Sequence, residues 1–350
     1  MKPDVVLDEE DFTLGFFTSN YPEIDHNKFL QETIGNDGYV LQEKIILPAR
    51  LSTNAALFSA CSIAAGRCNP PLIFTSHNSL PPQYTSLVAR PKSPRTIIHK
   101  QDAAIKVTAP ETNLLFSAPL LSKTEKTVES FSAVFDKTSD ILRSCKMAEM
   151  HVARTWIYLD DILGDYEILN NAREAFFARW YSAANHFLPA STGIEGHVIP
   201  PAPLALRFCA FSGKDISIKQ QTSPLQNEAT EYGKLFSRCV VVGLPQNQLV
   251  YISGTASIDK SGASVYTGNF TRQMEFTLEI LAAILKEVNG DFSHTAQATV
   301  YLKNHQDIDA CRKILDKSGF PASRALFQLD HHVCRDDLLC EIELTAVIRR

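Results

Sequence analysis

The C-terminal segment 338–348 alternates between two kinds of side chain. Successive side chains of a strand point to opposite faces, and here one face is wholly apolar, with Leu338, Cys340, Ile342, Leu344, Ala346 and Ile348. The opposite face carries Leu339, Glu341, Glu343, Thr345 and Val347. Its two carboxylates stand about 7 Å apart along the strand. The pattern predicts a strand whose acidic face is either exposed to solvent or buried in a contact with another part of the protein.

A similar order of predicted elements occurs twice in the chain. The apolar run "TWIYLDDI" at 155–162 precedes a helical stretch and then "FLPAST" at 187–192. The run "ATVYLKNH" at 298–305 precedes a second helical stretch and then "FPASRA" at 320–325. Because the order repeats along with the words, we expect two copies of one unit, although the identities are few.

The second copy shows its elements most clearly. "RCVVVGLPQNQLVYISGTAS" predicts a hairpin, and a short third strand follows it. The next stretch predicts a helix ending at Asn289-Gly290, with apolar residues at helical spacing: Met274, Leu278, Leu281, Leu285 and Val288. The expected order is β-β-β-α-β-α-β-β. The fold class is therefore α+β, with two tandem units of residues 1–215 and 216–350, each a mixed sheet with helices on one face.

Composition narrows the class of protein. The chain has 350 residues, 45% hydrophobic and 21% charged, with a formal net charge of -5 and no long basic tract. We therefore expect no nucleic-acid partner. The N-terminal residues are acidic, and the apolar stretch 45–66 is interrupted by Pro48, Arg50 and Asn54. These features predict neither a secretory signal nor a membrane span, and hence a cytoplasmic protein.

The cysteines and histidines do not predict a metal site. Eight cysteines are scattered without a CxxC pair, which is typical of reduced, buried thiols. His331, His332 and Cys334 supply only a partial ligand set. The chain also lacks GxGxxG and GxxxxGK[ST] motifs, so we expect no metal and no cofactor.

The second copy resembles the RidA/YjgF family of reactive-intermediate deaminases, through "SGTAS", "TVYL", "FPASRA" and "CEIELTAVIRR". The resemblance implies that Arg324 binds a substrate carboxylate and that Glu341 acts at the reacting centre. The alternative is an internal ion pair between these two residues. In the first copy Thr192 stands in place of the arginine, and Arg207 lies on the strand where the acid would be. We therefore expect one competent site per chain.

The whole chain from about residue 151 resembles the chorismatase family. The matching words are "RTWIYLDDI", "NNAREAFF", "LPASTGIEG", "SPLQNEATEYGKLFSR", "YISGTASI" and "VCRDDLLCEIE", whereas residues 1–110 match much less clearly. The resemblance, which includes a chorismate-mutase-like unit fold, implies a cofactor-free enzyme. It converts chorismate to pyruvate plus a hydroxybenzoate, with 3-hydroxybenzoate favoured. A homo-oligomer is possible, and it would be a trimer, as in the single-unit proteins.

Candidate site residues lie inside these matching words. Glu341 is the expected general acid, because burial beneath a dianion would raise its pKa, and Glu343 is its neighbour. Arginine forks suit carboxylates, so we expect Arg154, Arg238 and Arg324 to bind substrate, unless they form structural ion pairs. Further candidates are Tyr232 as a hydrogen-bond donor or packing residue, Gly254 near the ring, and Cys334 as a catalytic or inert thiol.

Three other functions remain open. The first is a RidA-type enamine or imine deaminase using the same arginine and glutamate. The second is a chorismate hydrolase that gives a dihydroxycyclohexadiene carboxylate. The third is a ligand-binding protein without turnover, since the fold alone does not imply catalysis.

Overall fold

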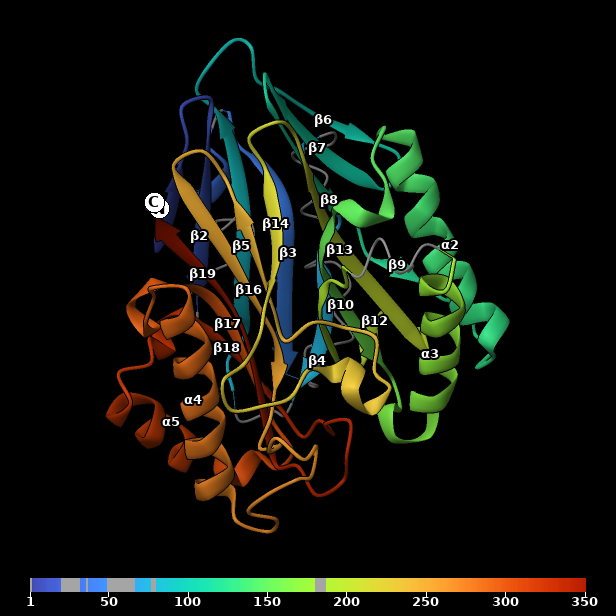
Figure 1. Ribbon diagram of the computed structural model, residues 1–350, viewed down its shortest axis with the longest axis vertical. Coiled ribbons are helices and arrows are strands. Elements are labelled where there is room, and N and C mark those ends of the chain that lie inside the picture. The colour runs from blue at the N-terminus through green and yellow to red at the C-terminus, as the bar shows by residue number, and fades with distance from the viewer. Residues whose placement is uncertain (1, 20–31, 36, 49–66, 77–79, 180–186) are drawn as a thin grey trace.

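The computed structural model describes residues 2–19, 32–35, 37–48, 67–76, 80–179 and 187–350 (Figure 1). These residues form three β-sheets. The first sheet contains five strands from the N-terminal part of the chain and one short later strand: β1 Val5–Asp8, β2 Phe12–Ser19, β3 Tyr39–Pro48, β4 Leu72–Ser76, β5 Gln83–Pro91 and β12 Val198–Ile199.

The other two sheets carry the long helices. The second sheet and its helices comprise β6 Ile97–Gln101, β7 Ala104–Ala109, β8 Thr112–Ser117, β9 Leu120–Leu121, α2 Val128–Ser144, β10 Val152–Leu159, α3 Ile162–Phe177, β11 Ala190–Glu195 and β13 Leu204–Ser212. The third sheet and its helices comprise β14 Ser217–Gln221, β15 Cys239–Gly243, β16 Asn247–Thr255, α4 Phe270–Glu287, β17 Thr295–Leu302, α5 Ile308–Lys317, β18 Ala325–Leu329 and β19 Cys340–Arg349.

One strand order recurs in all three sheets. Each contains an antiparallel hairpin, which is β1–β2, β7–β8 or β15–β16, and the second and third sheets add one edge strand before it, β6 or β14. Two parallel strands follow, which are β3–β4, β10–β11 or β17–β18. The last strand, β5, β13 or β19, inserts between the hairpin and the parallel pair. The structure thus adds a third sheet to the two predicted ones, because the N-terminal part of the predicted unit 1–215 builds a sheet of its own.

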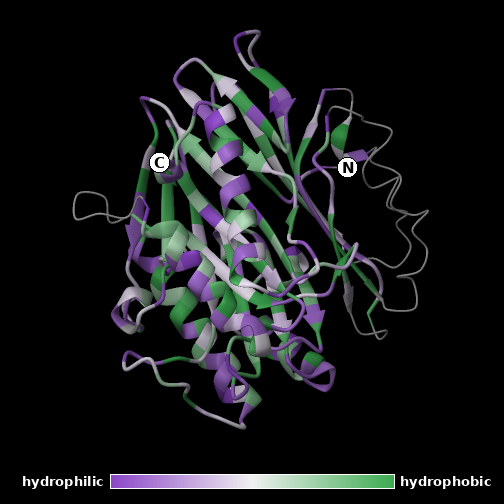
Figure 2. Cartoon of the chain, turned by 90° about the vertical axis from the view of Figure 1, so that its right-hand side faces the viewer, coloured by the Kyte–Doolittle hydropathy of each residue, from purple (hydrophilic) through white to green (hydrophobic). Residues whose placement is uncertain are grey.

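The helices lie on the outside and the sheets meet in the middle, so that α4 and α5 lie on one side of Figure 1 and α2 and α3 on the other. The apolar face of β19 packs under α4 and α5, as its alternation predicts. On the opposite side, α2 and α3 present hydrophilic and hydrophobic residues in alternating patches, as amphipathic helices on a sheet do (Figure 2). The remaining sheet faces form a shared core, in which Leu14, Leu114 and Leu249 come from different sheets.

Both faces of β19 are buried. Glu341 and Glu343 each expose only 4% of their surface, so the acidic face is not exposed to solvent. It faces the second sheet, where the hydroxyl of Thr192 in β11 accepts a 3.0 Å hydrogen bond from the amide of Gly254 in β16. The strand therefore carries two carboxyl groups into the contact between the second and third sheets.

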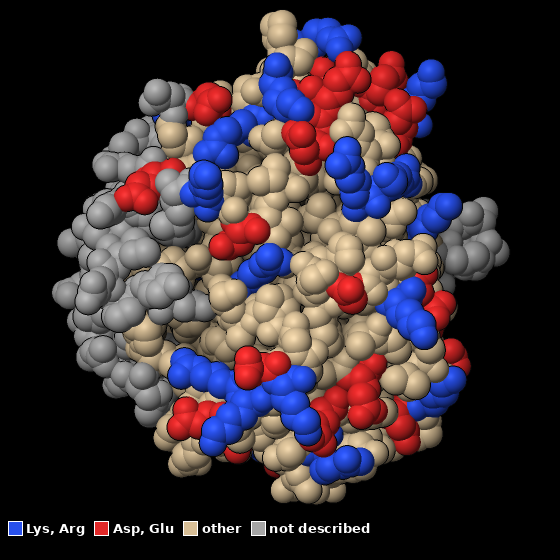
Figure 3. All heavy atoms as spheres, turned by 90° about the vertical axis from the view of Figure 1, so that its left-hand side faces the viewer, with Lys and Arg blue, Asp and Glu red and all other residues tan. Residues whose placement is uncertain are grey.

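The surface and the cysteines agree with the composition. No helix among the described residues is long and apolar enough to cross a membrane. Lysine and arginine side chains are interspersed with aspartate and glutamate on the face shown in Figure 3. The seven cysteines in the described ranges are all free thiols, as their scattered spacing predicts.

Candidate active site

Glu341 lies where β19, β16 and β11 meet. It pairs with Tyr301 of the neighbouring strand β17, and its carboxyl group fills the space above Gly254. A Cβ atom on Gly254 would overlap that carboxyl group and approach Thr192. The glycine therefore makes room for the acid.

The surroundings of Glu341 favour its neutral form. Burial raises the pKa of this carboxyl group, and the nearby Glu343 raises it further, whereas Arg154 and Arg238 lower it. The result is a pKa of about 8. A carboxyl group with this pKa keeps its proton at neutral pH, which is the state that a general acid needs.

Glu343 has the opposite character, because two cations bind it. The ammonium group of Lys44 lies 3.0 Å from one carboxylate oxygen, and the guanidinium of Arg154 lies 2.7 Å from the other. Tyr301 donates a further hydrogen bond of 2.9 Å. Burial raises the pKa of Glu343, but Lys44 and Arg154 outweigh burial and lower it to about 2. Glu343 is thus a permanent anion that links all three sheets.

The guanidinium group of Arg154 has one nitrogen that could bind a ligand. Its side chain is 1% exposed, and one nitrogen, Nη2, contacts Glu343 and Thr192. The other terminal nitrogen, Nη1, is buried and has no hydrogen-bond partner among the described residues. A buried unpaired guanidinium nitrogen is costly, so this group is poised for an anionic oxygen or a water molecule.

A small cavity of about 70 Å³ opens between the sheets beside Arg154. We call it the central cavity. It is lined from all three sheets by Gln42, Glu43, Lys44, Leu72, Thr85, Arg154, Trp156, Tyr158, Arg207, Gln297, Ala298, Thr299, Glu343, Leu344 and Thr345. The guanidinium of Arg154 lies 5.0 Å from the Trp156 ring centre, which holds the cation against an aromatic face.

More cations lie near Glu341. Arg238 is 2% exposed, and its Nε donates a 3.1 Å hydrogen bond to the carbonyl of Asn227. Arg238 and Arg173 of α3 both lie over the Phe236 ring, at 5.5 and 5.8 Å. Burial lowers the pKa of Lys234, and the nearby Arg173 lowers it further. This group of positive charges suits a ligand with more than one carboxylate.

Cys334 belongs to the same neighbourhood. Burial raises the pKa of its thiol to about 12, with a further contribution from Glu341 and opposing ones from Arg335, Arg238 and Lys234. The thiol is therefore protonated at neutral pH and is not a nucleophilic thiolate.

Two predicted residues stand apart from this group. Arg324 donates hydrogen bonds to the carbonyls of Ser293 and Thr295, at 2.9 and 2.8 Å. It immediately precedes β18 near the start of β17, whereas Glu341 pairs near the end of β17. The structure thus does not bring Arg324 and Glu341 together. The side chain of Tyr232 lies outside the described part of the chain.

Sequence reasoning missed several residues of the site. Lys44 lies in the N-terminal region that matches family words poorly, so nothing there marked it. Arg173 stands inside the matching word "NNAREAFF", and Lys234 inside "SPLQNEATEYGKLFSR", so those words held a signal for both.

Comparison with known proteins identifies the family of the chain. Residues 233–348 match the family described as Endoribonuclease L-PSP. RutC family protein UK114 of Drosophila melanogaster is 32% identical over 104 residues, which are 29% of this chain and 73% of that protein. The chain belongs to the RutC family. The human 2-iminobutanoate/2-iminopropanoate deaminase is 30% identical over 97 residues, which are 27% of this chain and 67% of that protein.

The match to the family described as Endoribonuclease L-PSP lies in the C-terminal part of the chain, which carries Glu341 and Cys334. It confirms the RidA-like unit predicted there. Over its whole length the chain has the fold of a chorismatase, whose crystal structure aligns with a TM-score of 0.72 and 17% identity. That alignment covers 97% of this chain and 100% of the chorismatase chain. The predicted α+β fold of repeated RidA-like units is therefore confirmed.

Proposed function

We propose that this protein converts chorismate into pyruvate and a hydroxybenzoate. One observation carries the proposal: Glu341 is a buried acid at the contact between two sheets, and burial and Glu343 raise its pKa to about 8 although Arg154 and Arg238 lie nearby. The fold shared with a chorismatase over nearly the whole chain supports the same reaction.

The charges of the site suit the substrate. Chorismate carries a ring carboxylate and an enolpyruvyl carboxylate, so its site must balance two negative charges. Arg154 offers its unpaired Nη1, and Arg238 adds a second guanidinium near Glu341. Guanidinium groups bind carboxylates through two parallel hydrogen bonds, which also orient them. We assign these two arginines to the two substrate carboxylates.

The reaction begins with proton transfer from Glu341 to the methylene carbon of the enol ether. The pyruvyl carbon then becomes an oxocarbenium ion, and the glutamate becomes a carboxylate that stabilises this cation. For the aromatic product, the ring hydroxyl oxygen attacks the neighbouring ring carbon while the bond from that carbon to the pyruvyl oxygen breaks, so that pyruvate leaves; loss of a ring proton then gives hydroxybenzoate, and the Glu341 carboxylate regains a proton. For the diene diol, water adds to the pyruvyl carbon, and the resulting hemiketal splits into pyruvate and the diol while the Glu341 carboxylate regains a proton. Chorismate divides into hydroxybenzoate and pyruvate without added water, oxidant or reductant, so no cofactor is required.

Cys334 and Gly254 favour the aromatic product in this proposal. Gly254 makes room for the Glu341 carboxyl group, and Cys334 lies close enough to Glu341 for that acid to raise the pKa of its thiol. A neutral thiol in this position excludes water from the ring without adding charge. We therefore favour 3-hydroxybenzoate over the hydrolytic product.

An imine deaminase is the second candidate, because the human relative bears that name. That activity would be expected to use Arg324 for the substrate carboxylate. In this chain Arg324 is bound to backbone carbonyls near the start of β17, and Thr192 lies beside the acid instead. This arrangement favours chorismate.

The direct test is to incubate the purified protein with chorismate and to measure pyruvate and aromatic product. We expect both products at equal amounts, and Glu341→Gln should lower the rate by about 10²–10⁴-fold, the usual contribution of a general acid. Glu9→Gln is the matched control, because Glu9 is also a buried glutamate but binds Asn247 at the far side of the third sheet.

Four results would change the assignment. Pyruvate without an aromatic product would identify the hydrolytic subtype. Ammonia release from 2-iminopropanoate, with chorismate untouched, would identify a deaminase. No turnover of either compound, or full activity in Glu341→Gln, would remove this acid from the mechanism.

A further inference from the structure

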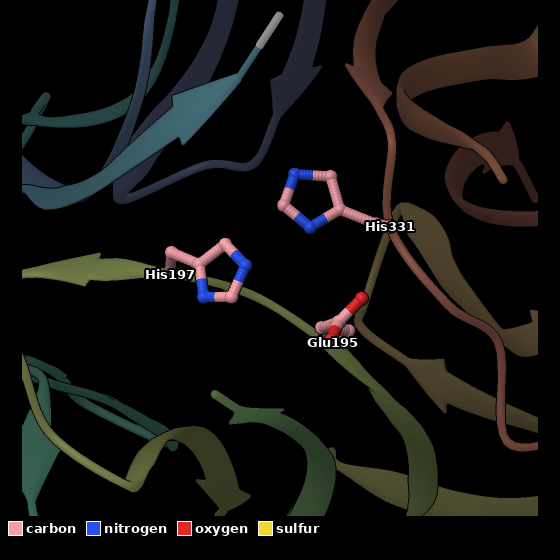
Figure 4. A group of neighbouring side chains, drawn as sticks. All are labelled: Glu195, His197 and His331. Carbon is pink, nitrogen blue, oxygen red and sulfur yellow. The ribbon is translucent and has the colours of Figure 1, made fainter. Parts of the chain in front are cut away.

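A second group of polar side chains lies outside the Glu341 site. Glu195 ends β11, His197 lies between β11 and β12, and His331 follows β18. One carboxylate oxygen and one ring nitrogen from each histidine all lie within 4.8 Å of one another. Figure 4 shows the three side chains converging on a common space from two separate stretches of the chain.

The imidazole ring of His331 is buried with little hydrogen bonding to compensate. It exposes only 1% of its surface, and among the described residues neither ring nitrogen makes a hydrogen bond of good geometry, although the backbone of Thr75 lies close enough to act on the pKa of the ring. A buried polar group without a partner loses the hydrogen bonds that it would make in water. The His197 and His331 ring centres lie 5.7 Å apart, a spacing that leaves room for an ion between their nitrogens.

Glu195 is held in place by a neighbour that leaves one of its oxygens available. The amide of His332 donates to Oε2 at 2.6 Å, and Nδ1 of the same residue lies 2.8 Å from that oxygen. No hydrogen bond to the other oxygen, Oε1, is found among the described residues. Metal-binding carboxylates are commonly fixed through such outer contacts while the remaining oxygen binds the ion.

We propose that Glu195, His197 and His331 bind a divalent transition metal ion, with zinc the best match. Two imidazoles and one carboxylate are a frequent zinc ligand set, and they leave a fourth position for water. His197 is exposed, so that position is open to solvent. The sequence motif "HHVC" offered only a partial ligand set, and the missing ligands come from residues more than 130 positions earlier in the chain.

The ion would join parts of the fold that carry the proposed active site. Glu195 ends β11 of the second sheet, His197 lies in the link from β11 to β12 of the first sheet, and His331 lies in the segment leading to Cys334 in the third. The carbonyl of His197 also accepts a 3.2 Å hydrogen bond from Thr75 of the first sheet. A bound metal would therefore fix the 330–334 segment and connect all three sheets at one end.

The test uses the full-length protein after treatment with a chelator. Titration with Co²⁺, followed by visible absorption, should show one ion per chain, and Zn²⁺ should displace it. His197→Gln should weaken binding at least 100-fold while the fold is retained, because this side chain is exposed. His332→Gln should weaken binding by about 10–100-fold without changing the stoichiometry.

His305→Gln is the control. His305 is partly exposed and pairs with Asp330 at 3.0 Å, one residue from His331, but it lies outside the ligand group. It should bind the ion as the wild type does. Absence of stoichiometric binding in the wild type would overturn the proposal, and so would unchanged binding in both His197→Gln and His331→Gln.

Discussion

Glu341 and Glu343 stand two residues apart on one face of β19, yet their surroundings move their pKa values in opposite directions. Burial and the neighbouring carboxylate of Glu343 raise the pKa of Glu341 to about 8. Glu343 has Lys44 and Arg154 within ion-pair distance, and its pKa falls to about 2. One strand thus supplies a protonated acid and a carboxylate anion. Because their pKa values lie on opposite sides of neutral pH, Glu341 is assigned as the proton donor and Glu343 as the fixed anion.

The raised pKa of Glu341 predicts a pH-dependent stability. Between its usual pKa of 4.5 and about 8, the folded state holds a proton that the unfolded state releases. The free energy of unfolding should therefore fall as pH rises through this window, by at most about 1.4 kcal/mol per pH unit, and level off above it. Urea unfolding from pH 5 to 9 measures this slope.

Glu341→Gln is the comparison for that experiment, because glutamine cannot ionise. The difference in unfolding free energy between the variant and the wild type should grow with pH up to about 8. Parallel curves for the two proteins would show that Glu341 ionises normally in the folded state.

Arg154 offers a second prediction at the level of one residue. Lysine in its place keeps a positive charge for Glu343 but removes the unpaired Nη1 that we assign to a substrate carboxylate. Arg154→Lys should raise KM for chorismate by about 10–100-fold, the value of one or two charge-assisted hydrogen bonds. An unchanged KM would mean that this nitrogen does not contact the substrate.

Among the elements, the contact between β11 of the second sheet and β16 of the third sheet determines where the acid acts. The alternation of segment 338–348 predicted which face of β19 carries the acids, because a strand fixes that from the sequence alone. It left open whether the face is buried, since burial depends on a sheet far away in the chain. Arg324 and Glu341 were expected in one site, but they lie near opposite ends of β17, and Thr192 of the second sheet lies against the acid instead.

A glycine-to-alanine pair tests this contact. Gly254→Ala should displace the Glu341 carboxyl group and lower kcat for pyruvate release at least 100-fold. Gly193→Ala is the matched control in β11, because its Cβ would meet only Leu169, at an ordinary 4.0 Å. Equal activity in the two variants would show that the space above Gly254 is not needed.

Across the whole molecule, three sheets of one strand order create three similar contacts, but their chemistry differs. Glu341 of β19 is paired with Tyr301 on the neighbouring strand. The residues at the matching position in the other two sheets are Gln83 of β5, paired with Ile46, and Ala205 of β13, paired with Tyr158. The Gln83 side chain instead donates to and accepts from the backbone of Phe327, at 2.9 and 2.8 Å. Only β19 has an acid at this position, which supports one site per chain.

The N-terminal sheet could not be predicted from the sequence, although it supplies Lys44, which binds the carboxylate of Glu343. Residues 1–110 lack the repeated words, and the strand order they adopt is visible only in three dimensions. Sequence reasoning therefore found two units and the C-terminal acid, but not the cation that holds Glu343 in its charged state.

Removing that cation should destabilise the fold. Lys44→Met leaves Glu343 buried with one partner fewer, and we expect a loss of about 3–5 kcal/mol in unfolding free energy. Lys92→Met is the matched control: Lys92 lies 2.9 Å from Asp8, but both side chains are more than one-third exposed, so its loss should cost at most about 1 kcal/mol. Similar losses in both would show that the buried contact has no special weight.

The pH dependence of kcat/KM for pyruvate release from chorismate tests the central claim most directly, because this ratio reports the titration of the free enzyme. With Glu341 as the general acid, the ratio should be high at pH 6–7 and fall tenfold per pH unit above about 8. A ratio that stays constant or rises through pH 9 would contradict the assignment of a protonated Glu341 as the group that starts the reaction.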